Sequence, residues 1–341
     1  MDRFAPSLRT LLATLLFGLA ATAAGAQTLI VDREAVEKAI AAGALVWDVR
    51  SAEEYAKGHI PGAVNIGPVA DVFRDTNRED PPSAAAASRL FGSAGMDILR
   101  RPVITYSTRG DAFAYYGARM IEYYGGQHAK VFHGGLDDWT AAGKAVETAP
   151  VRLAAVPLEL TVERRGAVTT KEVVERVRSG NAQILDTRTP KEYSGEDIRA
   201  IRGGHLAGAI LIPYEQNWSD PDAGVKLAQK KVANRDGMTL KPPSELKALY
   251  SKLDPAKETV VYCQSGVRAS ETAAVLRDLG FKDVKVYEES WLGYAGDLSA
   301  PAEAQVFVNV GALNGRLSSL QSRVNELEAE LAKLKAPPAA R

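Results

Sequence analysis

The chain has 341 residues, which is enough for two globular domains at roughly 100–200 residues each. Apolar residues make up 46% and charged residues 25%, as is ordinary for a folded soluble protein. Lys plus Arg and Asp plus Glu both number 42, so no net charge steers the chain toward nucleic acid or an anionic membrane, and we expect no nucleic-acid partner.

The first 26 residues have the pattern of a secretory signal. Arg3 and Arg9 supply a positive flank, and an uncharged, mostly apolar run of about 15 residues follows. A small-x-small cleavage site ends at Ala26, which predicts Gln27 as the mature start. The run is shorter than the ~20 residues that span a bilayer. We therefore predict that residues 1–26 are a signal peptide and that the protein is secreted, in a bacterium to the periplasm; an uncleaved membrane anchor is the alternative.

The mature sequence contains one unit twice, at about residues 29–144 and 168–297. Each copy begins with a helix-like stretch, at 32–42 and at 169–179. An apolar strand follows and ends in an Asp-x-Arg motif, and then come a Glu-Tyr pair and a Gly-His turn. In the two copies these motifs are Asp48-Val49-Arg50 and Asp186-Thr187-Arg188, Glu54-Tyr55 and Glu192-Tyr193, and residues 58–63 and 204–209.

The second half of each unit alternates short strands with helices. β-Branched strands at 103–106 and 259–262 lead through a loop into helices at 112–124 and 269–279, and each copy closes with a strand and an aromatic-rich turn, at 131–139 and 284–294. This alternation predicts a parallel sheet covered on both faces, so each copy is expected to be one α/β domain.

The most informative segment is the loop at residues 262–268, which contains the only cysteine of the chain, Cys263. Backbone N–H groups in such a strand-to-helix loop can form an anion cradle, and the helix adds its positive N-terminal dipole. Both features, and the charge of Arg268, would stabilise a thiolate. Gly266 permits backbone angles that other residues resist. A buried inert cysteine is the alternative, since a lone cysteine cannot form an internal disulfide.

The C-terminal segment has a different pattern. Its apolar residues recur at intervals of three and four over more than three heptads, at Val310, Leu313, Leu317, Leu320, Val324, Leu327, Leu331 and Leu334. This narrow stripe predicts a coiled-coil helix at residues 308–335 and a homo-oligomer formed through residues 310–334. The alternative is an amphipathic helix that packs on its own domain, although such helices usually bury a wider stripe.

The Asp-x-Arg strand ends, the Gly-His turns and the Cys-x-Ser-Gly-x-Arg loop together resemble those of tandem rhodaneses, the thiosulfate or 3-mercaptopyruvate sulfurtransferases. The resemblance extends over about residues 29–297. It implies two α/β domains with central parallel sheets, at residues 27–145 and 168–300, with a linker at 146–167 and the helix after them. It also implies that Cys263 receives the transferred sulfur.

The resemblance further implies roles for residues around Cys263. Arg268 is expected to be catalytic, and loop residues Gln264, Ser265, Gly266 and Val267 are expected to bind the substrate. Arg188 is a candidate for binding the anionic group of the donor, with a salt bridge inside the domain as the alternative.

Other implied roles are structural. Asp186 is expected to brace the loop, and His59 and His205 to hold their turns rather than act as bases. With four His and one Cys in the chain, no zinc site is expected, and no cofactor or nucleotide loop is evident.

Two positions depart from the family pattern. Ser107 lies opposite Cys263 when the two copies are aligned. A serine hydroxyl cannot form a persulfide and no base is evident to activate it, so the first copy is expected to be silent and to cover one side of the active cleft. Glu289 replaces a glycine in the closing turn and adds negative charge near the expected donor path.

We therefore expect a ping-pong sulfurtransferase with a small anionic sulfur donor and a cyanide or thiol acceptor. Two alternatives are a sulfur carrier or scaffold with slow turnover, and a cysteine-based phosphatase or arsenate-type enzyme. Rhodanese-like phosphatases carry one more residue between Cys and Arg than this loop does, which favours sulfur transfer.

Overall fold

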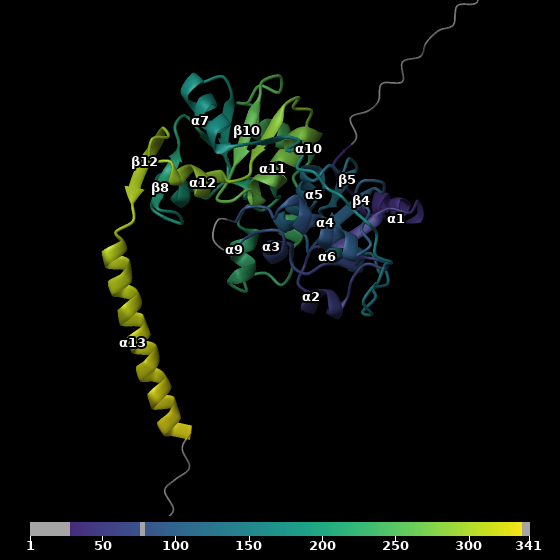
Figure 1. The fold of residues 1–341 in the computed structure, drawn as a ribbon, viewed down its shortest axis with the longest axis horizontal. Coiled ribbons are helices and arrows are strands. Elements are labelled where there is room, and N and C mark those ends of the chain that lie inside the picture. Colours follow the sequence, from purple (N-terminus) through teal and green to yellow (C-terminus); the bar gives the residue numbers. More distant parts are fainter. Residues whose placement is uncertain (1–27, 76–78, 336–341) are drawn as a thin grey trace, which may run out of the picture.

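The computed structural model describes residues 28–75 and 79–335 (Figure 1). The predicted signal peptide lies outside these ranges. Two five-stranded parallel sheets, each flanked by helices, form two consecutive domains, which confirms the predicted fold class. Within the described ranges, no helix has both the length and the apolar character needed to cross a bilayer.

Domain 1 contains a parallel sheet with strand order β1-β5-β4-β2-β3. Every residue of β2 and β4 is buried, as expected for central strands covered on both faces. The elements are β1 (Ile30–Val31), α1 (Arg33–Ala41), β2 (Leu45–Asp48), α2 (Ala52–Lys57), β3 (Val64–Asn65), α3 (Val69–Val72), α4 (Ala84–Ser93), β4 (Val103–Tyr106), α5 (Ala112–Tyr123), β5 (Ala129–Phe132) and α6 (Gly135–Ala141).

Domain 2 repeats this topology with strand order β6-β11-β10-β7-β9. Its elements are β6 (Ala167–Val168), α7 (Thr170–Ser179), β7 (Gln183–Asp186), α8 (Pro190–Ser194), β8 (Arg202–Leu206), β9 (Ile210–Leu211), the 3-10 turn η1 (Tyr214–Asn217), α9 (Ala223–Ala228), the 3-10 turn η2 (Asp236–Met238), α10 (Pro243–Leu249), β10 (Thr259–Tyr262), α11 (Val267–Asp278), β11 (Val284–Tyr287) and α12 (Ser290–Gly296). A capping box between Thr169 and Glu172 starts α7.

The two domains are joined through α5 and α11, the helices that follow the equivalent loops; they lie side by side at the centre of the molecule (Figure 1). Val267 and Ala274 of α11 belong to the same apolar cluster as the core of domain 1. The Asp278 carboxylate accepts hydrogen bonds from the backbone N–H groups of Leu29 (2.8 Å) and Ile30 (3.0 Å) beside β1. The interface is therefore continuous with the core of domain 1.

The segment predicted as a linker, residues 146–167, has no helix and no regular strand until β6. It is nevertheless held along domain 1. Its backbone N–H groups at Val151 and Leu160 donate to the Tyr55 hydroxyl and to the Ser88 hydroxyl, each at 3.0 Å. Leu160 is buried in the core cluster of that domain. The linker is thus bound to domain 1 and is not free in solvent.

The C-terminal part contains one strand that the sequence did not predict. β12 (Ala302–Phe307) pairs antiparallel with β8 and forms a separate two-stranded sheet. α13 (Val310–Lys335) then extends away from both domains (Figure 1). Every residue of α13 is exposed, including the whole apolar stripe. In this structure the helix does not pack on its own domain.

Candidate active site

The loop that contains Cys263 connects β10, a β-branched central strand, to α11. Cys263 is a free thiol with 1% of its surface exposed. Gly266 caps α11 with φ 84° and ψ −23°, in the left-handed region that favours glycine. A Cβ at this position would also lie in tight contact, 3.1 Å, with the carbonyl oxygen of Glu288, so the backbone angle, more than the space, favours glycine here. The turn therefore places the thiol at the N-terminus of α11, where the helix dipole favours a negative charge.

Ser290, in the turn after β11, holds this loop from the opposite side. Its hydroxyl accepts hydrogen bonds from the N–H groups of Cys263 (3.2 Å) and Gly266 (3.0 Å) and donates to the carbonyl of Tyr287 (2.6 Å). The Trp291 N–H also donates to the Cys263 carbonyl at 3.0 Å. Because two loop amides are bonded to Ser290, the anion cradle depends on the amides of residues 264, 265, 267 and 268. Sequence reasoning missed Ser290, since only tertiary structure brings it to the loop.

Arg268, near the Cys263 thiol, is paired with the carboxylate of Glu192. Its two terminal nitrogens donate to the two oxygens of Glu192, each at 2.7 Å, and Glu192 is also paired with Arg199 (3.2 Å). Burial alone would raise the pKa of Glu192, whose side chain is 1% exposed, but the hydrogen bonds and charge of Arg268 lower it to about 2. The charge of Arg268 is thus largely matched by a buried carboxylate. The sequence identified Glu192 only as part of a repeated Glu-Tyr pair and did not predict this ion pair.

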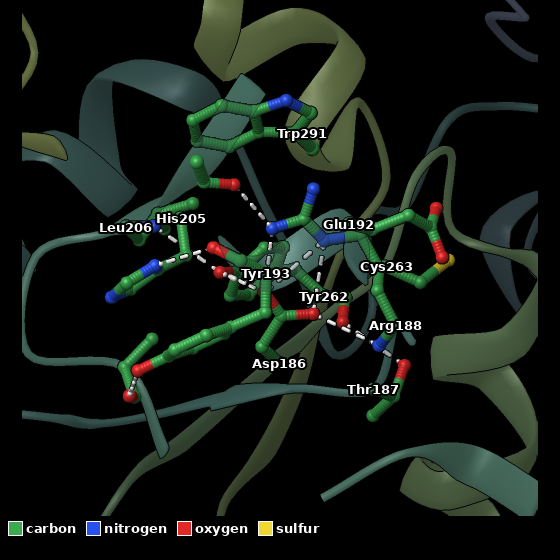
Figure 2. A network of polar contacts seen from close by, with 12 residues as sticks. Asp186, Thr187, Arg188, Glu192, Tyr193, His205, Leu206, Tyr262, Cys263 and Trp291 are labelled. Carbon is green, nitrogen blue, oxygen red and sulfur yellow. Dashed lines mark hydrogen bonds and ion pairs between the residues drawn. The ribbon is translucent and has the colours of Figure 1, made fainter. Parts of the chain in front are cut away.

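Arg188 lies in a buried brace with Asp186 and Tyr262 (Figure 2). The Asp186 carboxylate accepts two-pronged hydrogen bonds from Arg188 (2.7–3.1 Å) and one from the Tyr262 hydroxyl (2.5 Å). Arg188 also donates to the Gly204 carbonyl (2.7 Å), and its guanidinium carbon lies 4.8 Å from the ring centroid of Trp291. The Arg188 and Asp186 side chains are 1% and 0% exposed. The brace links β7, β10 and the Gly-His turn.

Domain 1 contains the same brace without a cysteine. Arg50 donates to Asp48 and to the Gly58 carbonyl (2.8 Å), and the Tyr106 hydroxyl donates to Asp48 at 2.7 Å. A network that is present where no thiol exists serves the fold. The structure therefore favours the salt-bridge alternative for Arg188 over donor binding, and it places Asp186 as the expected brace.

The profile of the rhodanese-like domain matches residues 32–142 and 169–297. This chain belongs to the rhodanese-like family. A thiosulfate sulfurtransferase of Corynebacterium glutamicum is 30% identical over 269 residues, covering 73% of this chain and 81% of the relative. That of Pseudomonas aeruginosa is 28% identical over 270 residues, covering 76% and 90%. A protein of Mycolicibacterium smegmatis is 34% identical over 271 residues and is covered to 87%. This rhodanese is a sulfurtransferase.

Solved structures agree on the fold. Wild-type EanB has a TM-score of 0.68 at 22% identity, covering 81% of this rhodanese and 69% of that chain. The anaerobic ergothioneine biosynthesis enzyme from Chlorobium limicola, solved with trimethyl histidine, has a TM-score of 0.67 at 22% identity, covering 81% and 70%.

The remaining loop side chains of this rhodanese are engaged by protein rather than open to a ligand. The Gln264 amide donates to the Arg199 carbonyl (2.8 Å), and Val267 is part of the interdomain core. The Ser265 hydroxyl accepts a hydrogen bond from Arg74, a domain 1 residue that sequence reasoning missed. The prediction that these residues bind substrate therefore rests on the backbone amides of residues 264, 265 and 267, because the amide of Gly266 is bonded to Ser290.

The equivalent loop of domain 1 is closed by its own side chains. The Ser107 hydroxyl donates to the Asp111 carboxylate at 2.5 Å. Arg109 is paired with Asp138 and with Asp236, the latter at 2.5 Å across the domain interface. No thiol is present, and the hydroxyl is bonded to a carboxylate, so this loop has no group that can carry sulfur.

The structure also shows the surroundings of the two turn histidines and of Glu289. His59 and His205 stack on Tyr55 and Tyr193, with ring centroids 3.7 and 3.5 Å apart, so each holds its turn. Glu289 is half-buried in the domain interface, and burial raises its pKa. Within residues 28–75 and 79–335, no group of three or more His, Cys, Asp or Glu side chains could hold a metal ion.

Proposed function

We propose that this rhodanese transfers the outer sulfur of thiosulfate, through a persulfide on Cys263, to cyanide or a thiol. The Cys263 thiolate attacks the outer sulfur of the donor, a new sulfur–sulfur bond forms, and sulfite leaves with the electron pair of the broken bond. In the second step the acceptor attacks the outer sulfur of the persulfide. Thiocyanate or a new persulfide forms, and the electron pair returns to Cys263 as thiolate.

One observation carries this proposal: the only thiol of the chain lies at the N-terminus of α11, in a loop fixed by Gly266 and Ser290. Such a position stabilises both the attacking thiolate and the anionic persulfide. Relatives named thiosulfate sulfurtransferases, matched over most of their length, support thiosulfate as the donor. 3-Mercaptopyruvate is the alternative donor within the same chemistry.

The test is persulfide formation followed by turnover. Wild-type protein incubated with thiosulfate should gain about 32 Da, one sulfur atom, as a covalent intermediate requires. Cys263→Ser, which is nearly isosteric, should keep the fold and lose both the mass gain and thiosulfate:cyanide activity. Activity in this variant would contradict the proposal. A parallel assay with mercaptopyruvate and a phosphate ester separates the donor alternatives from the phosphatase alternative, which requires ester hydrolysis to exceed sulfur transfer.

We also propose that α13 pairs in parallel register with a second copy of the chain. In one chain all eight apolar positions of the stripe are exposed, so water covers a seam that a partner helix would bury. With Leu317 at position a, Arg323 and Glu330 fall at g, and Glu328 and Lys335 fall at the following e positions. Both g–e′ contacts then join opposite charges in a parallel pair, although each is worth under ~1 kcal/mol.

Light scattering tests this assembly. The full chain should form a dimer or trimer at micromolar concentration, and a chain cut after Phe307 should be monomeric with sulfur transfer largely retained. A monomeric full-length protein would contradict the pairing. We propose in addition that the protein is exported, with Gln27 as the first residue of the mature chain. N-terminal sequencing of the periplasmic fraction checks this, and an intact residue 1–26 segment would favour the membrane anchor.

A further inference from the structure

The guanidinium groups near Cys263 differ in how their charge is balanced. Arg268 is paired with Glu192 and Arg188 with Asp186, and these carboxylates are 1% and 0% exposed. Such buried, two-pronged pairs do not readily exchange their carboxylate for another anion. A dianionic donor therefore needs a different cation close to the loop.

Arg74 meets this need from the other domain. It follows α3 directly after Phe73, a fully buried residue in the core of domain 1. Its side chain is 10% exposed, and its Nη2 donates to the hydroxyl of Ser265 and lies 3.5 Å from the Ser265 carbonyl oxygen. Tyr116 fixes this geometry, because its hydroxyl donates to the Phe73 carbonyl (3.1 Å) and its ring centroid lies 5.8 Å from the Arg74 guanidinium carbon.

The pairing of Arg74 is weaker than that of the other two arginines. Its carboxylate partner, Glu79, is 37% exposed, so solvent screens the pair. The Nε–H of Arg74 is buried, and in the part of the chain that the structure describes it has no hydrogen-bond acceptor. Burial lowers the pKa of Arg74 and the positive charge of Arg199 lowers it further, whereas the electrostatic interaction with Cys263 opposes this shift.

We propose that Arg74 is the residue that contacts the anionic end of the sulfur donor at Cys263, so that domain 1 supplies the donor-selecting charge of an active site otherwise built by domain 2. This rests on the function proposed above. During attack the sulfonate sulfur lies two sulfur–sulfur bonds from Sγ, about 4 Å at bond lengths near 2.05 Å. The guanidinium above Ser265, two residues beyond Cys263, can contact two sulfonate oxygens and the charge that grows on departing sulfite.

The test compares an anionic with a neutral reagent at the same thiol. Cys263 is the only cysteine, so alkylation by iodoacetate or iodoacetamide reports on this site alone. Arg74→Ala should lower the ratio of the iodoacetate to the iodoacetamide rate, and should lower kcat/KM for thiosulfate mainly through KM, by about 10- to 100-fold as for a lost charge-assisted hydrogen bond. Arg74→Lys should keep part of both. Arg100→Ala, at an 85% exposed side chain of the same domain, should change neither.

The outcomes separate this proposal from the proposed function. An unchanged ratio in Arg74→Ala would overturn the anion contact, and so would an equal fall in both alkylation rates, because that would show only a disturbed loop. If wild-type protein did not turn over thiosulfate but the ratio still fell in Arg74→Ala, the anion contact would stand and the proposed function would fail. Thermal unfolding of each variant checks the fold, and Arg74→Lys, which keeps the charge, covers the case in which Arg74→Ala does not fold.

Discussion

The loop after β4 in domain 1 and the loop after β10 in domain 2 have similar backbone conformations but different chemical groups. Each begins after a buried central strand and contains a left-handed glycine, Gly110 at φ 76° and Gly266 at φ 84°. In each, the carbonyl of the first residue accepts a backbone hydrogen bond of 3.0 Å from the turn after the next strand. The loop of domain 1 nevertheless has Ser107 where domain 2 has Cys263, and Gly135 where domain 2 has Ser290.

The comparison shows that the backbone conformation of the loop does not depend on the presence of the reactive cysteine. The Asp-Arg-Tyr brace and the stacked Tyr-His pair occur in both domains, so they belong to the fold. The Ser290 hydroxyl and the Arg268–Glu192 pair occur only around the thiol, since domain 1 has Gly135 and Ala112 at the equivalent positions. These few side chains separate the reactive loop from the silent one.

The largest expected effect comes from moving the thiol. The double variant Cys263→Ser, Ser107→Cys should have no measurable sulfur transfer, because the loop of domain 1 lacks the Ser290 hydroxyl and places Asp111 beside the new thiol. Ser107→Ala in the wild-type background should leave activity within about twofold, since the loop of domain 1 has no thiol that can carry sulfur. Thiosulfate:cyanide turnover measures both effects. Activity in the double variant would show that a thiol on this loop backbone is sufficient for sulfur transfer without the Ser290 hydroxyl.

Removing the arginine from either Asp-Arg-Tyr brace should lower the free energy of unfolding by a similar amount. Arg188→Leu and Arg50→Leu each leave a buried aspartate without its cation, which typically costs about 3–5 kcal/mol. Urea unfolding should show a similar loss for both variants, and the folded fraction of each should keep its KM for thiosulfate. A raised KM in Arg188→Leu with little loss of stability would restore Arg188 as a donor-binding residue.

The Arg268–Glu192 pair makes stability depend on pH. The pKa of Glu192 is lowered in the folded state from 4.5 to about 2, so the stabilisation is complete above pH 4.5 and is lost as the pH falls through about 2. The difference corresponds to about 3 kcal/mol at neutral pH. Glu192→Gln should lose roughly this amount at pH 7, and the gap to wild type should narrow steadily below pH 4.5.

A matched control for this change lies in domain 1. Glu54 occupies the equivalent position, but its carboxylate is exposed and, among the described residues, is bonded only to Lys57. Glu54→Gln should change the free energy of unfolding by well under ~1 kcal/mol, both at pH 7 and below pH 4.5. An equal loss in the two variants would mean that the position, and not the partner of Glu192, determines the effect.

Among the residues around the thiol, Ser290 is expected to show a smaller effect than Glu192. Ser290→Ala leaves the buried N–H groups of Cys263 and Gly266 without their acceptor, which costs about 1–3 kcal/mol. Ser290→Gly removes the same hydroxyl but suits the left-handed backbone at this position, φ 48°, as Gly135 does at φ 54° in domain 1. Calorimetry should therefore find the glycine variant the more stable of the two, while both lose a similar share of activity. Equal stability would show that the backbone angle costs nothing here.

Local patterns in the sequence predicted the repeated sheets, the thiol loop and the long C-terminal helix. The strand β12 escaped prediction because its partner β8 contains two glycines, Gly203 and Gly204, and lacks a clear alternating pattern. Ser290 and Arg74 escaped for a different reason. Each reaches the loop by a contact between residues 24 or more positions apart, and no local spacing encodes such a contact. The resemblance offered Arg188 as a donor-binding residue with a salt bridge as the alternative, and only its burial beside Asp186 favours the salt bridge.

The carboxylate of Asp278 has a consequence for the order in which the chain folds. It binds the N–H groups of Leu29 and Ile30, and it follows Leu29 by 249 residues. These two amides lie near the beginning of domain 1, whereas their acceptor is synthesised 249 and 248 residues later, at the end of α11 in domain 2. Until then these part-buried amides at the edge of the first sheet lack their carboxylate acceptor and bond to water instead. A nascent first domain is consequently unfinished until translation has passed the end of α11.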